Sequence, residues 1–361
     1  MKLAILVSGG RTGSDFFQSL LDDHSEILTF PGVFYFDEYL EELNKRNINP
    51  AELFVQMYEK FFDSRLNTEE RHHLLGKNKN EFFKIDKDTF IKNFKDNSKN
   101  NEAFELLKQL HLSYSFTKGE NTEVKKLIFL HIHHWYRLEK IKFLKFDLFY
   151  TLREPLVNLS SAINNWTKYE NSNFFSFRQL CYYYDRVVNG IDYCMQYKFD
   201  KFYIIKLEDM HLQSEKILSN FVKIYDLKFD KTLFQSTYHG KKWWGDAAGN
   251  RYLDGINKDY NGKIDIKLFN NKDIDYLMFK MSKIYNIYYK NKTQKIKKKM
   301  KYYFPLKVEY LMLKRNMNFS SLIRFCYFSF KRFIFLNKKF TNIYPESLSD
   351  VDSINKSYEQ K

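Results

Sequence analysis

Short apolar runs alternate along the chain with longer stretches in which apolar residues recur at helical spacing. Apolar runs of this length predict single buried strands, and they lie at residues 3–7, 26–32, 126–133, 146–151 and 202–207. Helical spacing predicts amphipathic helices at residues 16–21, 135–144, 175–195, 214–225 and 269–289. Strands that alternate with helices predict an α/β fold in which helices flank a parallel central sheet.

Residues 44–120 interrupt this alternation. They are polar and rich in Lys, Asn and Glu, and their scattered apolar residues, such as Leu53, Met57 and Phe61, keep helical spacing. We therefore predict a helical insertion between core strands, which is either a solvated scaffold or a cap over a binding site. His72 lies in this charged region and is expected to be exposed.

A second change in composition lies near residue 290. We predict that residues 1–290 form one α/β domain and that residues 291–361 form a basic, aromatic-rich and partly helical C-terminal extension. Between residues 291 and 340 there are 14 Lys and Arg and one acid, Glu309, so this segment carries +13 of the total net charge of +15. The remaining residues are nearly neutral, which argues against a nucleic-acid partner.

The extension has the features of a contact with an anionic membrane surface through residues 291–340. Lysines are dense from Lys295 to Lys301, and apolar residues then recur at helical spacing from Phe319 to Ile334. Charged residues such as Arg324 interrupt the second segment too often for it to cross a bilayer, whereas a basic aromatic helix can lie in the membrane interface. The alternatives are a helix that packs on the α/β domain and an RNA-binding tail.

Cysteine usage and the apolar pattern together predict a cytoplasmic protein. The three cysteines, Cys181, Cys194 and Cys326, have no metal-ligand spacing, and their low, odd number fits a reducing compartment. We find no secretory signal and no run of about 18 uncharged apolar residues. With the basic extension, the expected location is the cytoplasm, peripheral on the inner membrane face.

The first candidate for chemistry is the Gly-rich turn between the first strand and the first helix. It reads Ser8-Gly-Gly-Arg-Thr-Gly-Ser14. Glycines let the backbone approach a ligand closely, a helix N-terminus offers N–H groups to an anion, and Arg11 adds a forked positive charge. The alternative is a glycine turn without a ligand. The turn lacks the Gly-Lys-Ser/Thr of nucleotide triphosphatases, so the lysine and the magnesium-binding hydroxyl of a kinase are missing.

The second candidate follows the strand predicted at residues 146–151. Arg153 stands at the carboxyl end of that strand, where parallel sheets bind ligands, and its guanidinium matches phosphate geometry. Pro155 suits the first turn of a helix, and this helix carries Ser161. The alternative is that Arg153 pairs with Glu154 and that Ser161 faces solvent.

Together these segments resemble the sulfotransferase family. Arg11-Thr-Gly-Ser14 resembles the loop that grips the 5′-phosphosulfate of 3′-phosphoadenosine 5′-phosphosulfate (PAPS), and Arg153 with Ser161, eight residues later, resembles the pair that holds its 3′-phosphate. The stretch Leu21–Ile27 is also similar to that family, as is the basic Gly-Asp loop at residues 238–246. The resemblance covers scattered blocks of residues 1–290 and implies a P-loop-like sulfotransferase fold.

The resemblance implies that PAPS is the co-substrate, that no metal is required, and that a sulfuryl group moves to an acceptor hydroxyl. It implies donor contacts from the following residues: Arg11, Thr12, Gly13, Ser14, Asp15, Phe16, Arg153, Ser161, Lys241 and Lys242. Asp15 departs from the family, which usually has a hydroxyl there, and its charge would repel the donor unless it caps the helix or turns away. We expect a glycan or lipid-linked glycan acceptor, with proteins and small metabolites as alternatives.

The catalytic residues implied by the resemblance are Arg11, which stabilises charge on the leaving phosphate, and a histidine base. His131 and His133 lie on one face of the strand predicted at residues 126–133, and the cytosolic branch of the family has its base on the corresponding strand. Asp37 or Glu38 are the alternatives for the base. Two other functions stay open, a P-loop kinase and a non-catalytic scaffold at a membrane surface.

Overall fold

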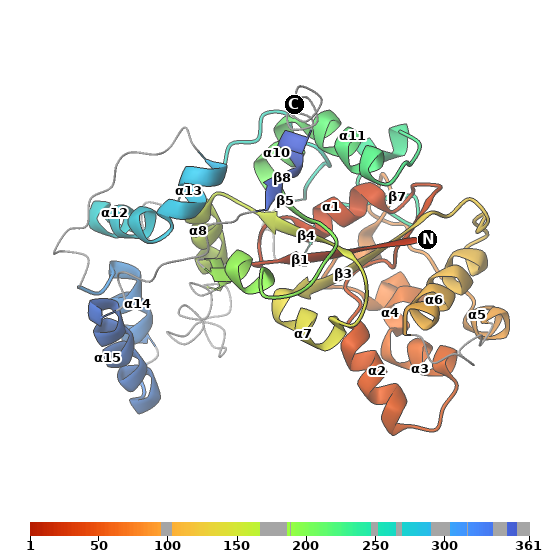
Figure 1. Ribbon diagram of the computed structural model, residues 1–361, viewed down its shortest axis with the longest axis horizontal. Helices are drawn as coiled ribbons and strands as arrows, with labels where there is room; N and C mark the ends of the chain where they lie inside the picture. Colours follow the sequence, from red (N-terminus) through yellow and green to blue (C-terminus); the bar gives the residue numbers. More distant parts are fainter. Residues whose placement is uncertain are drawn as a thin grey trace.

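A six-stranded sheet forms the centre of the computed structural model, which describes residues 1–94, 103–166, 186, 187, 189–246, 252–264, 269–289, 304–315, 317–334 and 345–351. In spatial order the strands are β2 (Ile27–Leu28), β3 (Leu127–His134), β1 (Lys2–Ser8), β4 (Asp147–Leu152), β5 (Phe202–Lys206) and β8 (Glu346–Ser347). All neighbouring strands are parallel, and helices cover both faces of the sheet (Figure 1). The prediction of an α/β fold with a parallel central sheet is confirmed.

Fourteen helices are described around the sheet in those residues. They are α1 (Ser14–Leu21), α2 (Phe36–Lys45), α3 (Pro50–Met57), α4 (Glu59–Phe62), α5 (Lys87–Asn93), α6 (Ala103–Thr117), α7 (Leu138–Ile141), α8 (Pro155–Trp166), α10 (Leu207–Leu212), α11 (Ser214–Ile224), α12 (Asn271–Lys280), α13 (Ser282–Tyr288), α14 (Lys307–Arg315) and α15 (Phe319–Ile334). The predicted helix at residues 269–289 is thus two helices. The helix predicted at residues 175–195 lies largely outside the described residues.

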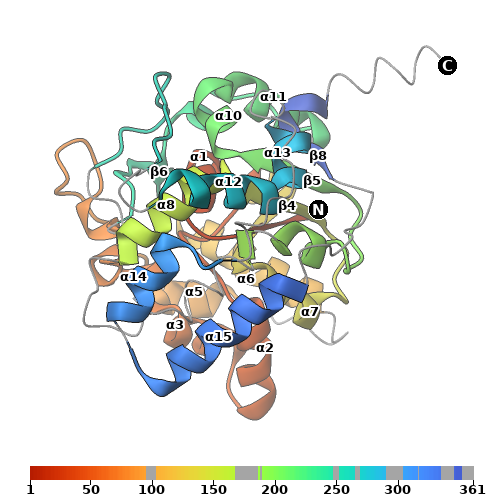
Figure 2. The same cartoon turned by 90° about the vertical axis from the view of Figure 1, so that its left-hand side faces the viewer.

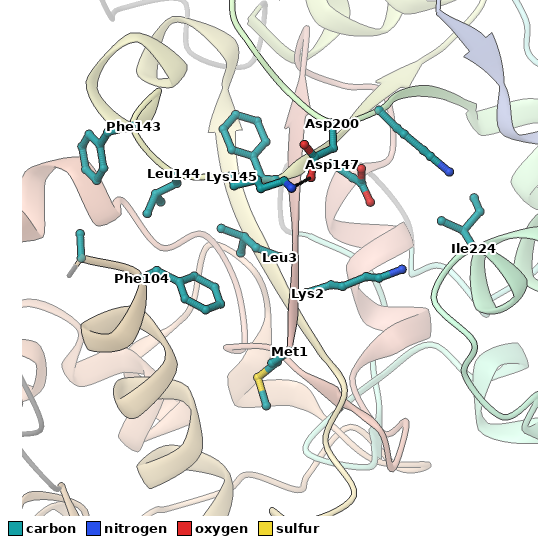
Figure 3. Close-up of a pocket in the computed structure, with 13 residues that line it drawn as sticks. Met1, Lys2, Leu3, Phe104, Phe143, Leu144, Lys145, Asp147, Asp200 and Ile224 are labelled. Carbon is teal, nitrogen blue, oxygen red and sulfur yellow. Dashed lines mark ion pairs between the residues drawn. The ribbon is translucent and has the colours of Figure 1, made fainter.

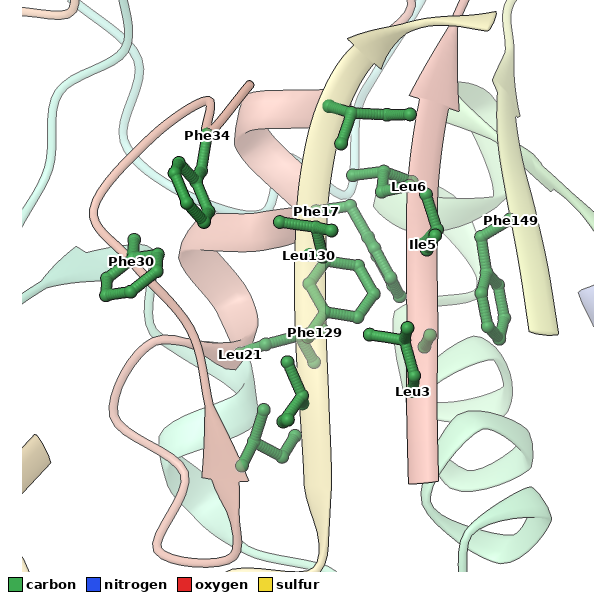
Figure 4. Close-up of a cluster of buried hydrophobic side chains, with 14 of the residues drawn as sticks. Leu3, Ile5, Leu6, Phe17, Leu21, Phe30, Phe34, Phe129, Leu130 and Phe149 are labelled. Carbon is green, nitrogen blue, oxygen red and sulfur yellow. The ribbon is translucent and has the colours of Figure 1, made fainter. Parts of the chain in front are cut away.

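The core of the molecule lies on both sides of β1. Residues 4–7 of this strand are fully buried, as expected for a strand with helices on both faces. Phe17 of α1 packs with its ring 5.8 Å from that of Phe129 on β3 and 5.5 Å from that of Phe221 on α11, and Figure 4 shows Phe17 and Phe129 within this cluster. Each such buried ring stabilises the fold by about 1.5–3 kcal/mol, so α1 and the turn before it are fixed to the sheet.

The predicted insertion is helical, and its aromatic residues cover the β2 edge of the sheet. The ring of Phe30, just after β2, lies 4.8 Å from Phe54 and 5.1 Å from Tyr114, and the Tyr114 hydroxyl donates to the Phe61 carbonyl at 2.5 Å. The expectation that His72 is exposed is wrong: its side chain is fully buried, because it packs with its ring 4.0 Å from that of Tyr238.

The C-terminal part of the chain returns to the sheet. β8 pairs with β5 and lies within the segment predicted as an extension. The Tyr288 hydroxyl donates to the Pro345 carbonyl at 2.8 Å, so the described residues that flank 290–344 are in contact. Within this segment α14 packs against α8 and α12 in a second apolar cluster, through side chains that include Val308, Met312 and Leu159.

Candidate active site

Two large cavities lie at opposite ends of the central strands. One, of about 780 Å³, lies at the amino ends of β1 and β4 and is lined by Lys2, Leu3, Phe143 and Asp147 among others (Figure 3). The other, of about 880 Å³, lies at the carboxyl ends of β1, β3, β4 and β5. Parallel sheets bind ligands at the carboxyl ends of their strands, and both predicted motifs border the second cavity, so this cavity is the candidate active site.

The Gly-rich turn forms one wall of the cavity. Gly13 caps α1 in a left-handed conformation with φ of 84°, which glycine adopts without steric cost. A Cβ at this position would lie 2.5 Å from Leu207 Cδ1, so only glycine lets the turn pack against α10. The turn therefore brings the first N–H groups of α1, which have no acceptor within the helix, to the cavity wall.

Arg11 lies on this wall and forms an ion pair. Its Nη1 is 3.3 Å from Asp246 Oδ2, and both side chains are partly exposed. The predicted Gly-Asp loop thus reaches the cavity through its acid. Its two lysines do not line the cavity: Lys241 pairs with Glu81 at 2.8 Å and Lys242 pairs with Asp254.

Two of the three hydroxyl residues of the turn, Thr12 and Ser14, have different surroundings. Thr12 is buried, and its hydroxyl lies 2.7 Å from that of Thr151, so it joins the turn to β4. Ser14 lines the cavity, and its hydroxyl lies 3.4 Å from His133 Nδ1. Of the two, Ser14 is the residue that can meet a ligand.

Arg153 and Ser161 line the same cavity. The Nε atom of Arg153 is buried and has no hydrogen-bond partner in the part of the chain that the structure describes, so a donor group is left for a ligand. Glu154 has a structural task, since its carboxylate accepts from the Val157 N–H at 2.6 Å and from the Tyr285 hydroxyl at 2.5 Å. Ser160, the neighbour of Ser161, is buried and does not line the cavity.

Aromatic rings also line this cavity. The ring of His211 stacks 4.7 Å from that of Phe16 and 4.6 Å from that of Tyr260. The Asn257 N–H donates to His211 Nδ1 at 3.1 Å, which holds the imidazole in place. The sequence did not identify three residues that line this cavity, His211, Tyr260 and Arg186. Tyr260 lies in residues 252–264, which have no periodic pattern, and Arg186 lies in a stretch that predicted only a helix.

The two candidate histidines on β3 have different surroundings. The pairing of β1 with β3 skips Ile132, and this bulge gives His133 a left-handed backbone with φ of 59°. His133 lines the cavity, whereas His131 does not. His131 is buried, and its Nδ1 lies 2.9 Å from Gln18 Oε1. Because the Gln18 amide nitrogen donates to two backbone carbonyls at 2.7 and 3.1 Å, Oε1 must accept and His131 Nδ1 must carry the proton.

Electrostatics make His133 a neutral imidazole at neutral pH. Burial, and then the positive charge of Arg186, lower its pKa to about 4, against a smaller opposing effect of Asp246. A neutral imidazole can accept a proton. Burial also lowers the pKa of His131 well below its usual value, but this ring has no access to the cavity.

Asp15, the residue that departs from the family pattern, has a pKa raised to about 8. Burial is the main cause, and the negative charges of Glu70 and Asp246 add to it. The carboxyl group is therefore mainly protonated at neutral pH, which removes the repulsion expected between this residue and an anion in the cavity.

Asp15, His131 and His133 could also hold a metal ion, since their ligand atoms lie within 4.8 Å of one another. A metal would have to displace the proton from Asp15 and would compete with the hydrogen bond between His131 and Gln18.

The alternative candidates for the catalytic base, Asp37 and Glu38, do not line the cavity. Both bind Arg137, whose Nη1 is 2.8 Å from Asp37 Oδ2 and whose Nη2 is 2.5 Å from Glu38 Oε1.

No protein-family model and no curated protein matches the chain. Solved structures that are similar to it include two sulfotransferase domains. The sulfotransferase domain of the Synechococcus PCC 7002 olefin synthase shares 14% identity over 65% of this chain and 76% of that chain, with a TM-score of 0.36. The sulfotransferase domain from the curacin biosynthetic pathway shares 14% identity over 83% of this chain and 94% of that chain, with a TM-score of 0.38.

Proposed function

We propose that the protein is a PAPS-dependent sulfotransferase. The observation that carries the proposal is that cationic and hydroxyl residues from two segments far apart in the sequence line one cavity: Arg11 and Ser14 from the first, and Arg153 and Ser161 from the second. Its volume of about 880 Å³ is in the range of small-molecule sites and suits a nucleotide with phosphates at both ends.

The lining residues divide into three binding tasks for this donor. Arg11 and the N-terminus of α1 would hold the phosphosulfate, and Arg153 with Ser161 would hold the 3′-phosphate. Between them, the rings of Phe16, His211 and Tyr260 offer apolar surface to a purine. Arg11 would exchange its ion pair with Asp246 for the donor, so binding replaces one charged partner by another.

The chemistry follows from these positions. The bound donor supplies the sulfuryl group. Arg11 and the Ser14 hydroxyl stabilise the charge that develops on the leaving phosphate oxygen, and His133, neutral and at the cavity wall, takes the proton of the acceptor hydroxyl. His131 holds Gln18 and β3 in place, so its task is positional.

For the acceptor we propose a glycan or a lipid-linked glycan, in a cytoplasmic setting. Exposed aromatic and amide side chains at the cavity rim, Tyr252 and Asn257, are of the types that stack on sugar rings and hydrogen-bond their hydroxyls. Comparing sulfated glycans, lipids and metabolites with and without the enzyme tests this class, because incorporation only into a non-glycan product contradicts it.

Donor binding tests the proposed function directly. Adenosine 3′,5′-bisphosphate should raise the thermal unfolding temperature of the full chain, because a ligand at 100 times its Kd stabilises the folded state by about 2.7 kcal/mol. ATP with magnesium should have little effect, since the turn lacks the kinase lysine. A larger effect of ATP with magnesium would favour the kinase alternative, and no effect of either ligand would favour a non-catalytic scaffold.

Donor affinity should also weaken as the pH rises through about 8. Asp15 is protonated below its raised pKa of about 8 and gains a negative charge above it, which repels the donor. Asp15→Asn cannot ionise, so its donor KM should stay flat from pH 7 to pH 9 while that of the wild type rises. Asp88→Asn on α5, away from the cavity, is the control and should follow the wild type. A rise in KM that persists in Asp15→Asn would contradict this explanation.

A further inference from the structure

Helix α15 presents a broad apolar face to solvent. Five residues form this face at helical spacing, and each is between 44% and 79% exposed. They are Phe319, Leu322, Ile323, Tyr327 and Phe330. On the other side of the helix, Phe325 and Phe328 pack against the second apolar cluster, so α15 is attached to the body by one face while the opposite face exposes bulky apolar side chains to solvent.

The exposed face continues onto neighbouring residues. Tyr310 and Leu311 of α14, Met317 between the two helices and Phe304 before them are also exposed. The ring of Tyr310 lies 5.4 Å from that of Phe325, which joins α14 to α15. Figure 2 shows α15 lying lengthwise across this end of the molecule. The exposed apolar residues of 304–330, which lie on or beside two helices in contact with each other, are called the α14–α15 surface below.

The charge of this region has one sign. Residues 304–334 contain six Lys and Arg and one acid, Glu309. Glu309 is buried and accepts from the Leu306 N–H at 2.7 Å, so it does not face the surface. Lys314 is exposed and Arg324 is partly exposed, at positions on the same two helices as the aromatic residues. An occupant of this surface must therefore accept bulky apolar side chains and supply negative charge beside them.

We propose that the α14–α15 surface docks on an anionic phospholipid bilayer. Aromatic and aliphatic side chains would enter the level of the headgroups, and lysine and arginine would contact phosphates, as in helices that lie in the membrane interface. The helices would lie on the bilayer, since no described helix is both long and apolar enough to cross it. The surface is separate from the active site, so docking does not depend on the proposed chemistry.

The test uses the full chain, because truncation after Tyr289 would also remove β8 from the sheet. Wild-type protein should co-sediment with vesicles of phosphatidylcholine and phosphatidylglycerol, and salt should weaken this binding. Phe319→Ser with Phe330→Ser should lower the vesicle partition coefficient about tenfold or more, since both rings leave water on docking. Phe116→Ser is the matched control, because Phe116 is 56% exposed on α6, and it should bind as the wild type does.

A second double variant tests whether the positive charge of the α14–α15 surface contributes to binding. Lys314→Glu with Arg324→Glu should lose binding to anionic vesicles by a similar factor. All four substituted residues are exposed or partly exposed, so unfolding temperatures should stay close to wild type. Equal binding to phosphatidylcholine alone, or full binding by the Phe319 and Phe330 variant, would overturn the proposal. A dimer in sedimentation velocity that this variant abolishes, without vesicle binding, would assign the surface to a second copy of the chain.

Discussion

Arg153→Ala is expected to abolish detectable sulfuryl transfer and to weaken binding of adenosine 3′,5′-bisphosphate by about 30- to 5,000-fold. Removing one partner of a hydrogen-bonded charge pair costs about 2–5 kcal/mol, and each 1.4 kcal/mol is a factor of ten. The Nε atom of Arg153 is buried without a partner among the described residues, so this donor is left for the ligand. Burial raises the pKa of the Glu208 carboxyl, and the positive charge of Arg153 opposes this shift, so the variant should lose some stability, and the larger effect should be on ligand binding.

Calorimetric titration of Arg153→Ala with adenosine 3′,5′-bisphosphate measures this effect, and the unfolding temperature of the unliganded variant checks the fold. Arg11→Ala should also abolish transfer, because it removes the charge beside the phosphosulfate. Arg137→Ala is the matched control: it breaks the pairs with Asp37 and Glu38 and should lower stability while donor affinity is unchanged. Near wild-type affinity in Arg153→Ala would show that the 3′-phosphate binds elsewhere.

His133→Asn is expected to lower turnover by about 10²–10⁴, the range for a positioned general base, with donor affinity retained. Asparagine is the better replacement than alanine because it tolerates the left-handed backbone that His133 adopts, so a loss of activity reports chemistry and not strain. In the wild type the base must be deprotonated. With the His133 pKa lowered to about 4, the rate should rise with pH through about 4 and then level off.

Comparison with His131→Asn distinguishes a histidine that acts as the catalytic base from one that only supports the structure. His131 lies outside the cavity and donates to Gln18, so this variant should lose stability and retain the acid limb of the pH–rate profile. Single-turnover rates at saturating donor measure both variants. Full activity in His133→Asn, or loss of the acid limb only in His131→Asn, would place the base elsewhere than on His133.

The sequence predicts the local parts of this structure well and the distant pairings less well. Strands such as β1 are short continuous apolar runs, and the Gly-rich turn and Arg153–Ser161 are local motifs whose positions follow from the strands before them. β8 was not predicted, because Glu346–Ser347 has no apolar pattern and becomes a strand only by pairing with β5. This pairing also places part of the predicted C-terminal extension in the central sheet.

Within the site, alternation along a regular strand puts His131 and His133 on one face. The bulge at Ile132 separates them, and no sequence pattern marks such a bulge. Likewise the charge of Lys241 and Lys242 suggested donor contacts, but acids from elsewhere in the chain, Glu81 and Asp254, bind them. These partners are distant in sequence, so only the folded structure reveals which cations are left for a ligand.

The hydrogen bond between Tyr288 and Pro345 has a consequence for the history of the molecule. A segment whose two ends are adjacent can enter or leave a fold without altering the connectivity of its sheet, and closing a longer loop costs little additional entropy. Tyr288 and Pro345 flank residues 290–344 in this way. A lineage could therefore exchange this segment by recombination as one unit, and its exposed α14–α15 surface could change independently of the catalytic machinery while the side chains that pack on α8 and α12 are kept.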